Sequence, residues 1–105
     1  MYIYLDKSSS GGGGVAVDSK DNVYVSDQTL PRVQKFDSDG NFIKMWGEEG
    51  NDKGEFVHQH DITVDSKDYV YVTDGREKSR VSVFDSDGNY KIYITLLYEV
   101  YIIVI

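Results

Sequence analysis

Residues 15–27 read VAVDSKDNVYVSD, and residues 62–74 read ITVDSKDYVYVTD. A second pair of stretches matches in the same way, with RVQKFDSDGNF at residues 32–42 and RVSVFDSDGNY at residues 80–90. The offset is 47 residues for the first pair and 48 for the second, so the later copy carries one inserted residue. Recurrence at a fixed period of this length indicates a repeat architecture. The chain therefore contains two copies of one structural unit.

Each copy is expected to form four short strands. Runs of about five β-branched and aromatic residues are separated by clusters of Asp, Ser, Lys, Gly and Asn, which favour turns. The expected strands are 14–18, 22–27, 32–37 and 41–46 in the first copy and 61–65, 69–74, 80–85 and 89–94 in the second. Connections of hairpin length make each group an antiparallel meander, as in a propeller blade. The predicted fold class is therefore all-β, with two four-stranded antiparallel propeller blades.

The segments between and before the blades are assigned by their composition. Residues 47–60 are Gly-rich and charged, and they are expected to cross from the first blade (14–46) to the second blade (61–94). Residues 1–13 are expected to form an irregular lead with a short strand at 2–5.

The tail 95–105 does not follow the repeat, and it is apolar with strong strand propensity. Residues 89–94 are expected to be the outer strand of the second blade. The rest of the tail should either extend that strand or fold back as one more strand, with residues 2–5 as a candidate partner.

Both copies resemble the NHL repeat. The resemblance is carried by VAVD (15–18), NVYVSD (22–27), RVQKFD (32–37), DGNF (39–42), WG (46–47) and GEF (54–56). It covers about residues 14–90. NHL proteins are commonly six-bladed β-propellers, so the resemblance implies a partial propeller of the NHL type.

Both ends of the chain depart from the NHL pattern. Residues 8–14 read SSSGGGG instead of an aromatic and proline lead-in, and residues 91–105 lack a Trp-Gly strand ending. These departures suggest a gene fragment or a shifted reading frame. Because a pair of blades leaves one face of each blade exposed, we expect self-association through the open faces, with three copies closing a six-bladed ring.

His58 and His60 are the candidate metal ligands. In an extended chain, residues i and i+2 point the same way, so both imidazoles can face one divalent metal. Zinc usually takes three or four protein ligands, which leaves an ordinary surface role as the alternative for this pair.

A second resemblance bears on this metal hypothesis. Residues 56–65 are similar to the blade entry of peptidyl-hydroxyglycine amidating lyases, NHL-type propellers that hold zinc with histidines from several blades. This resemblance implies zinc as a cofactor and places His60 at a ligand position ahead of Asp61, where the first copy has Gly13. Residues 74–77 (DGRE) also resemble the Asp-Arg-Glu-Asn turn of that family, with one glycine interrupting it. No catalytic residue is assigned.

Acidic residues recur at matching positions in both copies. The stretch DSDGN suggests calcium, but its spacing does not fit an EF-hand loop, and a hairpin turn is the favoured interpretation. Asp27 with Arg32, and Asp74 with Arg80, occur in each copy. A catalytic pair is needed once whereas a structural pair is needed in every repeat, so we interpret both as loop-ordering ion pairs.

Composition limits the classes of partner. Eighteen acidic and eleven basic residues give a net charge of -7, which disfavours nucleic acid and anionic membranes. The chain has no cysteine, and its start lacks the basic and apolar regions of a signal peptide. No transmembrane segment is predicted, and the compartment is left open.

The expected function is that of a protein- or peptide-binding or scaffold module. The candidate binding-face residues lie in the loops that enter and leave the second blade: Gln59, Asp61, Asp74, Arg76 and Glu77. The alternatives are a fragment of a zinc-dependent lyase of the amidating type and a truncated gene product without independent function.

Overall fold

A computed structural model describes residues 12–27, 30–75, 80–97 and 100–104. Within these ranges the chain forms β-strands joined by turns and loops, and no helix is present. The all-β prediction is confirmed. The expected strand at 2–5 lies outside the described residues.

The first sheet is an antiparallel meander of four strands in chain order. Its strands are β1 (Gly12–Val17), β2 (Val23–Asp27), β3 (Val33–Phe36) and β4 (Phe42–Trp46). The boundaries lie within one or two residues of those predicted. The matching β-branched and aromatic runs therefore form strands wherever turn residues bound them.

The second sheet repeats this meander and adds a fifth strand. Its strands are β5 (Gln59–Val64), β6 (Val70–Asp74), β7 (Arg80–Phe84), β8 (Tyr90–Leu97) and β9 (Val100–Val104). The prediction of four strands is correct for the repeat itself, and the fifth strand comes from the tail.

The tail both extends the outer strand and folds back as a further strand, which are the two outcomes predicted for it. Strand β8 continues to Leu97, beyond the expected end at residue 94, and β9 folds back to pair antiparallel with it. The pairing with residues 2–5 lies outside the description. Strand β5 begins at Gln59 because Gln59 already pairs with Asp74, so the crossover loop ends two residues earlier than expected.

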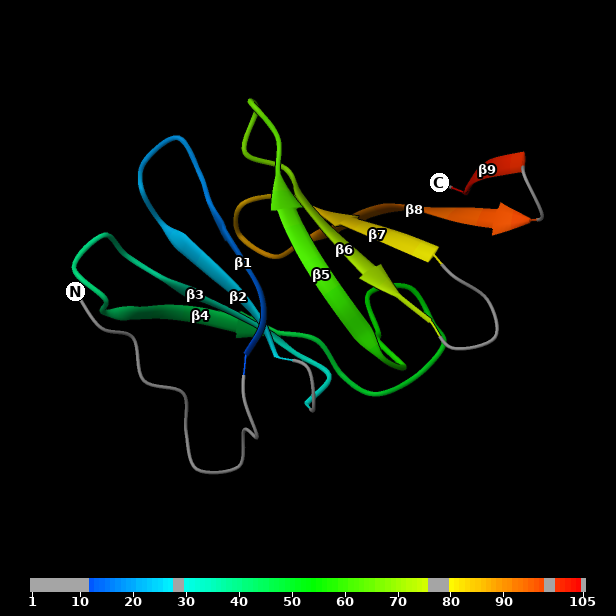
Figure 1. Cartoon of the computed structure of the whole chain (residues 1–105), viewed down its shortest axis with the longest axis horizontal. Helices are drawn as coiled ribbons and strands as arrows, with labels where there is room; N and C mark the ends of the chain where they lie inside the picture. The colour runs from blue at the N-terminus through cyan, green and yellow to red at the C-terminus, as the bar shows by residue number, and fades with distance from the viewer. Residues whose placement is uncertain (1–11, 28–29, 76–79, 98–99, 105) are drawn as a thin grey trace.

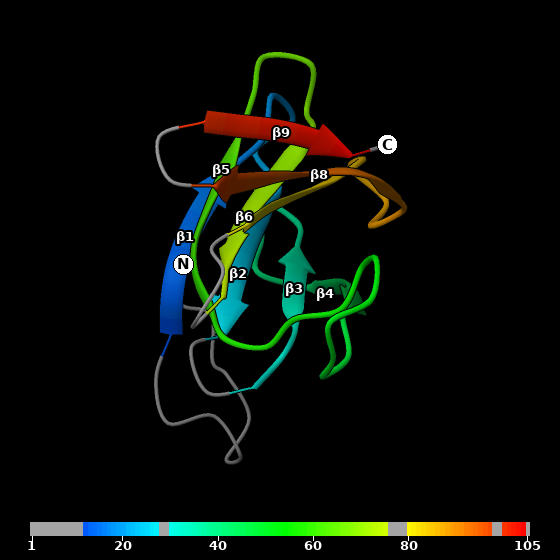
Figure 2. The ribbon, with the colours of Figure 1, turned by 90° about the vertical axis from the view of Figure 1, so that its right-hand side faces the viewer.

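The two sheets stand side by side, and β1 runs next to β5 (Figures 1 and 2). Their closest approach requires Gly14. A Cβ atom there would lie 2.4 Å from Oδ1 of Asp61 and 2.9 Å from the backbone nitrogen of Ile62. A glycine at this point therefore lets the inner strands of the two blades come together.

The hydrophobic core lies between the two sheets. Its buried members come from both sheets and from the crossover loop: Tyr24, Val33, Phe56, Ile62, Val70, Val72 and Phe84. Trp46 joins the sheets, because its ring centroid lies 6.2 Å from that of Tyr24 and 5.8 Å from that of Phe84. Burying side chains of this size stabilises a fold by roughly 1.5–3 kcal/mol each.

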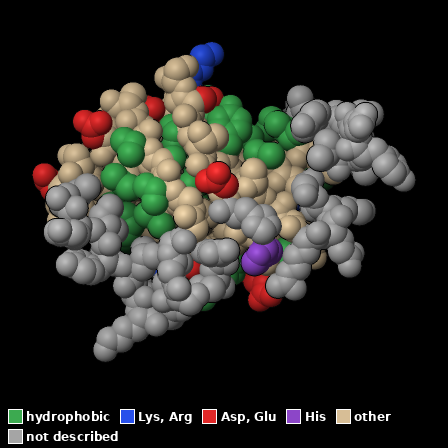
Figure 3. Space-filling view, in the orientation of Figure 1, with side chains coloured by type: hydrophobic (Ala, Val, Ile, Leu, Met, Phe, Trp, Pro, Cys, Tyr) green, Lys and Arg blue, Asp and Glu red, His purple; other side chains and the backbone are tan. Residues whose placement is uncertain are grey.

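The outer side of the first sheet is apolar but open, as the sequence predicted. Val15 and Val17 retain 62% and 53% of their exposure, and Phe42 retains 57%. Hydrophobic side chains gather over this sheet in the space-filling view (Figure 3). A smaller cluster of Val23, Val25 and Phe36 lies on the same side and is buried by its neighbours.

The strands end at two different edges, which an antiparallel meander separates (Figure 1). We name the turn edge after the tight turns 18–22, 37–41, 65–69 and 85–89. We name the loop edge after the connections 28–32, 47–58 and 75–79, of which 28–29 and 76–79 lie outside the description.

Candidate functional site

The loop edge contains most of the predicted site residues, and Asp74 is its anchor. Both carboxylate oxygens of Asp74 accept hydrogen bonds from the backbone N–H of Val57, at 3.0 and 3.1 Å. Oδ1 also accepts one from the backbone N–H of His58 at 2.6 Å. The carboxylate is buried and pairs with Nε of Arg80 at 3.5 Å. This side chain therefore fixes the start of β5 against the end of β6.

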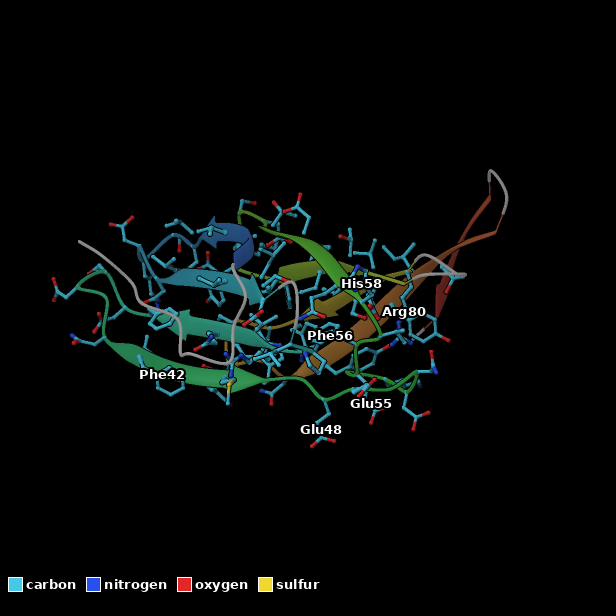
Figure 4. All side chains as sticks on the ribbon, turned by 60° about the horizontal axis from the view of Figure 1, so that its bottom comes forward. Phe42, Glu48, Glu55, Phe56, His58 and Arg80 are labelled. Carbon is cyan, nitrogen blue, oxygen red and sulfur yellow. The ribbon has the colours of Figure 1, made fainter. Side chains whose placement is uncertain are left out.

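Arg80 extends the anchor into the crossover loop (Figure 4). Its guanidinium donates hydrogen bonds to the carbonyl oxygens of Asn51 at 2.8 Å, Asp52 at 3.3 Å and Glu55 at 2.6 Å. It also lies over the ring of Tyr93, 5.6 Å from the centroid. One arginine thus ties the backbone of the loop to β7 and β8.

The crossover loop is further shaped by its own contacts. The backbone N–H of Phe56 donates to the carbonyl of Glu48 at 2.8 Å, and that of Gly50 donates to the carbonyl of Phe56 at 3.0 Å. The Phe56 ring packs on Phe84 with centroids 5.8 Å apart. Gly47 has φ of +110°, and a Cβ atom there would lie 2.6 Å from the carbonyl oxygen of Pro31. The loop is held at both ends and in its middle.

Gln59 connects the two blades. Its buried amide nitrogen donates to the carbonyl oxygens of Asp27 and Leu30 and contacts that of Arg32 at 3.3 Å. These carbonyls belong to the connection between β2 and β3 of the first blade. The amide therefore ties the start of β5 to backbone carbonyls of the first blade, in addition to the N–H groups of Arg32 and Asp27 that donate to the carbonyls of Leu30 and Arg32.

The first blade has its own version of the ion pair. Arg32 and Asp27 approach to 3.3 Å, and the Asp27 carboxylate accepts a hydrogen bond from the backbone N–H of Leu30 at 3.3 Å. The backbone N–H of Asp27 donates to the carbonyl of Arg32 at 3.2 Å. The interpretation of both Asp–Arg pairs as loop-ordering contacts is confirmed.

The predicted binding-face residues differ in their surroundings. Asp61 is exposed and His58 is half-buried at the loop edge, whereas Gln59 and Asp74 are buried in the contacts above. Arg76 and Glu77 lie outside the description. The accessible part of this edge is therefore made by the crossover loop, His58 and Asp61.

The two predicted metal ligands, His58 and His60, lie where β5 begins and its pairing is irregular. The register of β5 against β6 shifts between Gln59 and Ile62, so two residues are accommodated where regular pairing allows one. The argument that His58 and His60 point the same way assumes regular alternation, and the irregular register includes His60, so their common orientation stays a prediction. Nothing is described of the His60 side chain, so its role as a ligand stays a hypothesis.

Metal-binding clusters were sought across the described part of the chain. No group of three or more His, Asp or Glu side chains there is close enough to hold a metal ion. Zinc therefore stays an alternative that rests on resemblance.

The turn edge uses its carboxylates in a repeated way. Asp37 accepts hydrogen bonds from the backbone N–H groups of Asp39 and Asn41 at 2.9 Å each, and from the Asn41 amide at 3.1 Å. Asp85 repeats this pattern with Asn89. The DSDGN stretches are thus hairpin turns, and their glycines adopt φ near +85°.

These contacts change the acidity of the turn carboxyls. Hydrogen bonds from the backbone and side chain of Asn41 hold the pKa of Asp37 below its usual value. Burial raises the pKa of Asp18, but hydrogen bonds from Tyr24 and Asn22 outweigh it and the pKa is lowered. Tyr24 donates to Asp18 at 2.7 Å, and burial together with this bond raises the pKa of the Tyr24 hydroxyl. All of these groups stabilise turns.

Sequence reasoning missed two contacts of the loop edge. It did not find the Gln59 amide bound to the first blade or the loop carbonyls bound to Arg80. One signal was present, because Gln59 corresponds to Gly12 in the first copy and is therefore a difference between the repeats. The partners of Arg80 are backbone carbonyls, which every residue has, so the residue types of the loop do not indicate these contacts.

Two meanders packed side by side through their inner strands define a pair of β-propeller blades. The family model described as 6-bladed beta-propeller (DUF5128) matches residues 15–96, and the chain belongs to this family. The assignment to NHL repeats in particular stays a prediction. No helix among the described residues has the length and apolar character needed to span a membrane.

A relative is the probable peptidyl-alpha-hydroxyglycine alpha-amidating lyase pgal-1 of Caenorhabditis elegans. It is 31% identical to this chain over 80 residues, which is 72% of this chain and 23% of the relative. The chain thus spans about a quarter of that protein's length, and the lyase resemblance noted for residues 56–65 is supported as distant homology.

Proposed function

We propose that the chain is a propeller module that binds a protein or peptide partner at its loop edge without catalysis of its own. The observation that carries this proposal is how the charged groups are used. Asp37 and Asp85 cap turns, and Asp74 with Arg80 holds the crossover loop. A catalytic group needs access to substrate, which the buried Asp74 lacks, and the oxygens of Asp37 and Asp85 are already engaged by turn N–H groups.

The accessible side chains of the loop edge suggest the chemistry of the partner. Glu48, Glu49, Asp52 and Asp61 are exposed there, with Lys53 as an exposed cation among them. Figure 4 shows Glu48 projecting from the crossover loop, whereas Glu55 folds back and accepts a hydrogen bond from the backbone N–H of Asp52. A rigidly held loop with an excess of carboxylates is complementary to a basic peptide segment.

The test compares two edges of the same molecule. Labelled lysine-rich and glutamate-rich peptides of equal length are titrated with the protein by fluorescence anisotropy. We expect saturable binding of the lysine-rich peptide, weakened several-fold by Glu48→Gln with Glu49→Gln. The matched control is Asp39→Asn with Asp87→Asn, which removes the same charge from the turn edge. Equal weakening by both pairs would contradict a site at the loop edge.

The second candidate is a zinc lyase-like role, and homology to pgal-1 is the observation that favours it. His58 precedes β5 and His60 lies within it, at the loop edge. Zinc content is measured on purified protein and on His58→Ala and His60→Ala variants. Near-stoichiometric zinc that both variants lose would favour this role over the first, whereas less than one zinc per three chains would remove it.

A further inference from the structure

The open face of the first sheet has the same side chains as a face that is covered in the second sheet. We call the side of the second sheet that packs on the first blade the covered face. Its residues and their equivalents on the open face are Ile62 and Val15, Val64 and Val17, Val70 and Val23, Val72 and Val25, Phe84 and Phe36, and Tyr90 and Phe42. The two faces share one apolar pattern, and only one of them has a partner.

Exposure shows the difference directly. Ile62 is 6% exposed, whereas its equivalent Val15 is 62% exposed. Val17 and Phe42 are also more than half exposed. Their equivalents in the second sheet, Val64 and Tyr90, are partly buried against the core. An apolar surface of this kind on one side of a sheet usually has a partner.

The far face of the second sheet resembles the surface that does the covering. The first sheet covers its neighbour with Tyr24, Val33 and Trp46. Strand pairing places their equivalents together on the far face of the second sheet: Tyr71, Val81 and Ile94, joined by Val83 and Ile92. This face is therefore apolar at the positions that a covering blade uses.

We propose that a second copy of this chain docks head to tail, with the far face of its second sheet on the open face of the first sheet. The contact continues the interface already present between the two blades, because each side presents the equivalent residues. Three copies arranged in this way supply six blades, which is the number in the family. This inference is independent of the ligand proposed for the loop edge.

A polar contact gives the docking its register. Within the chain, the backbone N–H and the hydroxyl of Ser19 donate to the Asp68 carboxylate at 2.8 and 2.5 Å. Between copies, Ser66 and Asp21 occupy the equivalent positions. Asp21 and Asp68 share a φ of 64°, so the two turns have the same backbone conformation at this position.

Differences between the two copies of the repeat set the strength of the docking. Within the chain, Gly14 of the covering blade meets Asp61 of the covered blade; between copies the roles are exchanged, because Asp61 takes the covering position and Gly14 the covered one. The side chain of Asp61 therefore keeps the inner strands of two copies further apart than those within a chain. The amide of Gln59 has no counterpart, because Gly12 stands at its position. The contact between copies also lacks the hydrogen bond from Nζ of Lys35 to the Ser86 carbonyl, because Val83 stands at the position of Lys35. We therefore expect association between copies to depend on concentration.

Sedimentation velocity across a wide concentration range tests the association. We expect a concentration-dependent species of three times the monomer mass. The double variant Val15→Asp with Val17→Asp should stay monomeric with an unchanged far-UV circular dichroism spectrum, since both side chains are exposed in the single chain. The control Tyr69→Asn changes an exposed aromatic at the turn edge to the residue of the first copy, and it should associate like the parent. A parent chain that stays monomeric at all concentrations would overturn the proposal.

Mixing separates head-to-tail docking from face-to-face docking. Ile92→Asp disables the far face and leaves the open face intact, whereas the Val15, Val17 double variant does the reverse. Each folded variant should be monomeric alone, and an equimolar mixture should form a heterodimer with one intact interface. Ser66→Ala should weaken association of the parent about five-fold. Association of Ile92→Asp by itself, or no heterodimer on mixing, would contradict head-to-tail docking.

Discussion

The two copies of the repeat carry nearly the same residues, yet one face of the second sheet is buried and the same face of the first sheet is open. Ile62 is 6% exposed and its equivalent Val15 is 62% exposed, although they occupy the same position in strands of matching sequence. The repeat pattern therefore determines which side chains share a face of a sheet, and packing by a neighbouring blade determines how far the β1 and β5 positions on that face are buried. This comparison teaches that identical local chemistry can have very different energetic weight.

The strongest way to break the comparison is Val72→Asp. The new carboxylate would be buried between the blades without a partner, at a cost of several kcal/mol that is comparable to the stability of a small domain. We expect loss of the native circular dichroism spectrum or a collapsed urea midpoint. The neighbouring exposed Thr73 points to the other face, so Thr73→Asp is the control and should leave the fold intact. Equal damage by both variants would contradict the assignment of faces.

Asp74→Asn tests the anchor of the loop edge. Asparagine keeps the shape but loses the charge that pairs with Arg80 and one acceptor oxygen for the Val57 and His58 amides. We expect a loss of about 2–4 kcal/mol in the free energy of unfolding, measured by urea titration. Asp87→Asn, at an exposed turn, should change the stability by less than about 0.5 kcal/mol. A loss below about 1 kcal/mol for Asp74→Asn would show that the anchor is weak.

Gln59→Ala sharpens the comparison by giving the second copy a small residue where the first has Gly12. The backbone carbonyls of Asp27 and Leu30 would lose the hydrogen bond from the Gln59 amide, and we expect a loss of about 1–3 kcal/mol in thermal or urea unfolding. Gln34→Ala is the matched control, because the buried Gln34 amide nitrogen has no hydrogen-bond partner in the described part of the chain. Equal losses in both variants would contradict the role of the clamp.

The turn edge should make stability depend weakly on acid. The pKa values of Asp18, Asp37, Asp65 and Asp85 are lowered in the folded protein. Their stabilisation is therefore fully present above the unfolded pKa of about 3.9 and is lost as the pH falls through the lowered folded values. Urea midpoints should be constant from about pH 7 to 5 and should fall below about pH 4. Asp18→Asn should flatten part of this fall, and an unchanged slope would contradict the contribution of that carboxyl.

The repeat made most of the fold predictable, because turn residues and β-branched runs recur at fixed positions. Strands β2, β4 and β6 begin within one residue of expectation for this reason. Strand β9 could only be given as one of two outcomes, since an apolar tail with strand propensity can lengthen an existing strand or return along it. Where the tail stops extending β8 and turns back as β9 depends on tertiary pairing that local sequence does not encode.

The candidate site was less predictable than the fold. Residue types located the loop edge at Gln59 and Asp74, but they did not show that both side chains are buried and engaged. Burial of a polar side chain depends on backbone carbonyls and amides brought from other strands, such as the carbonyl of Leu30 beside Gln59. The irregular register after Gln59 also has no clear sequence signature, and it falls in the segment for which regular alternation of His58 and His60 was assumed.

The most direct test of the account introduces the same substitution at two equivalent positions in the inner strands of the two blades. Ile62→Asp and Val15→Asp introduce the same charge at equivalent positions, one covered and one open. Urea unfolding is measured on both variants in dilute solution, where association between copies is absent. The account predicts that Ile62→Asp loses several kcal/mol or the fold itself, while Val15→Asp unfolds within about 1 kcal/mol of the parent. Equal losses at the two positions, or a larger loss at Val15, would contradict it.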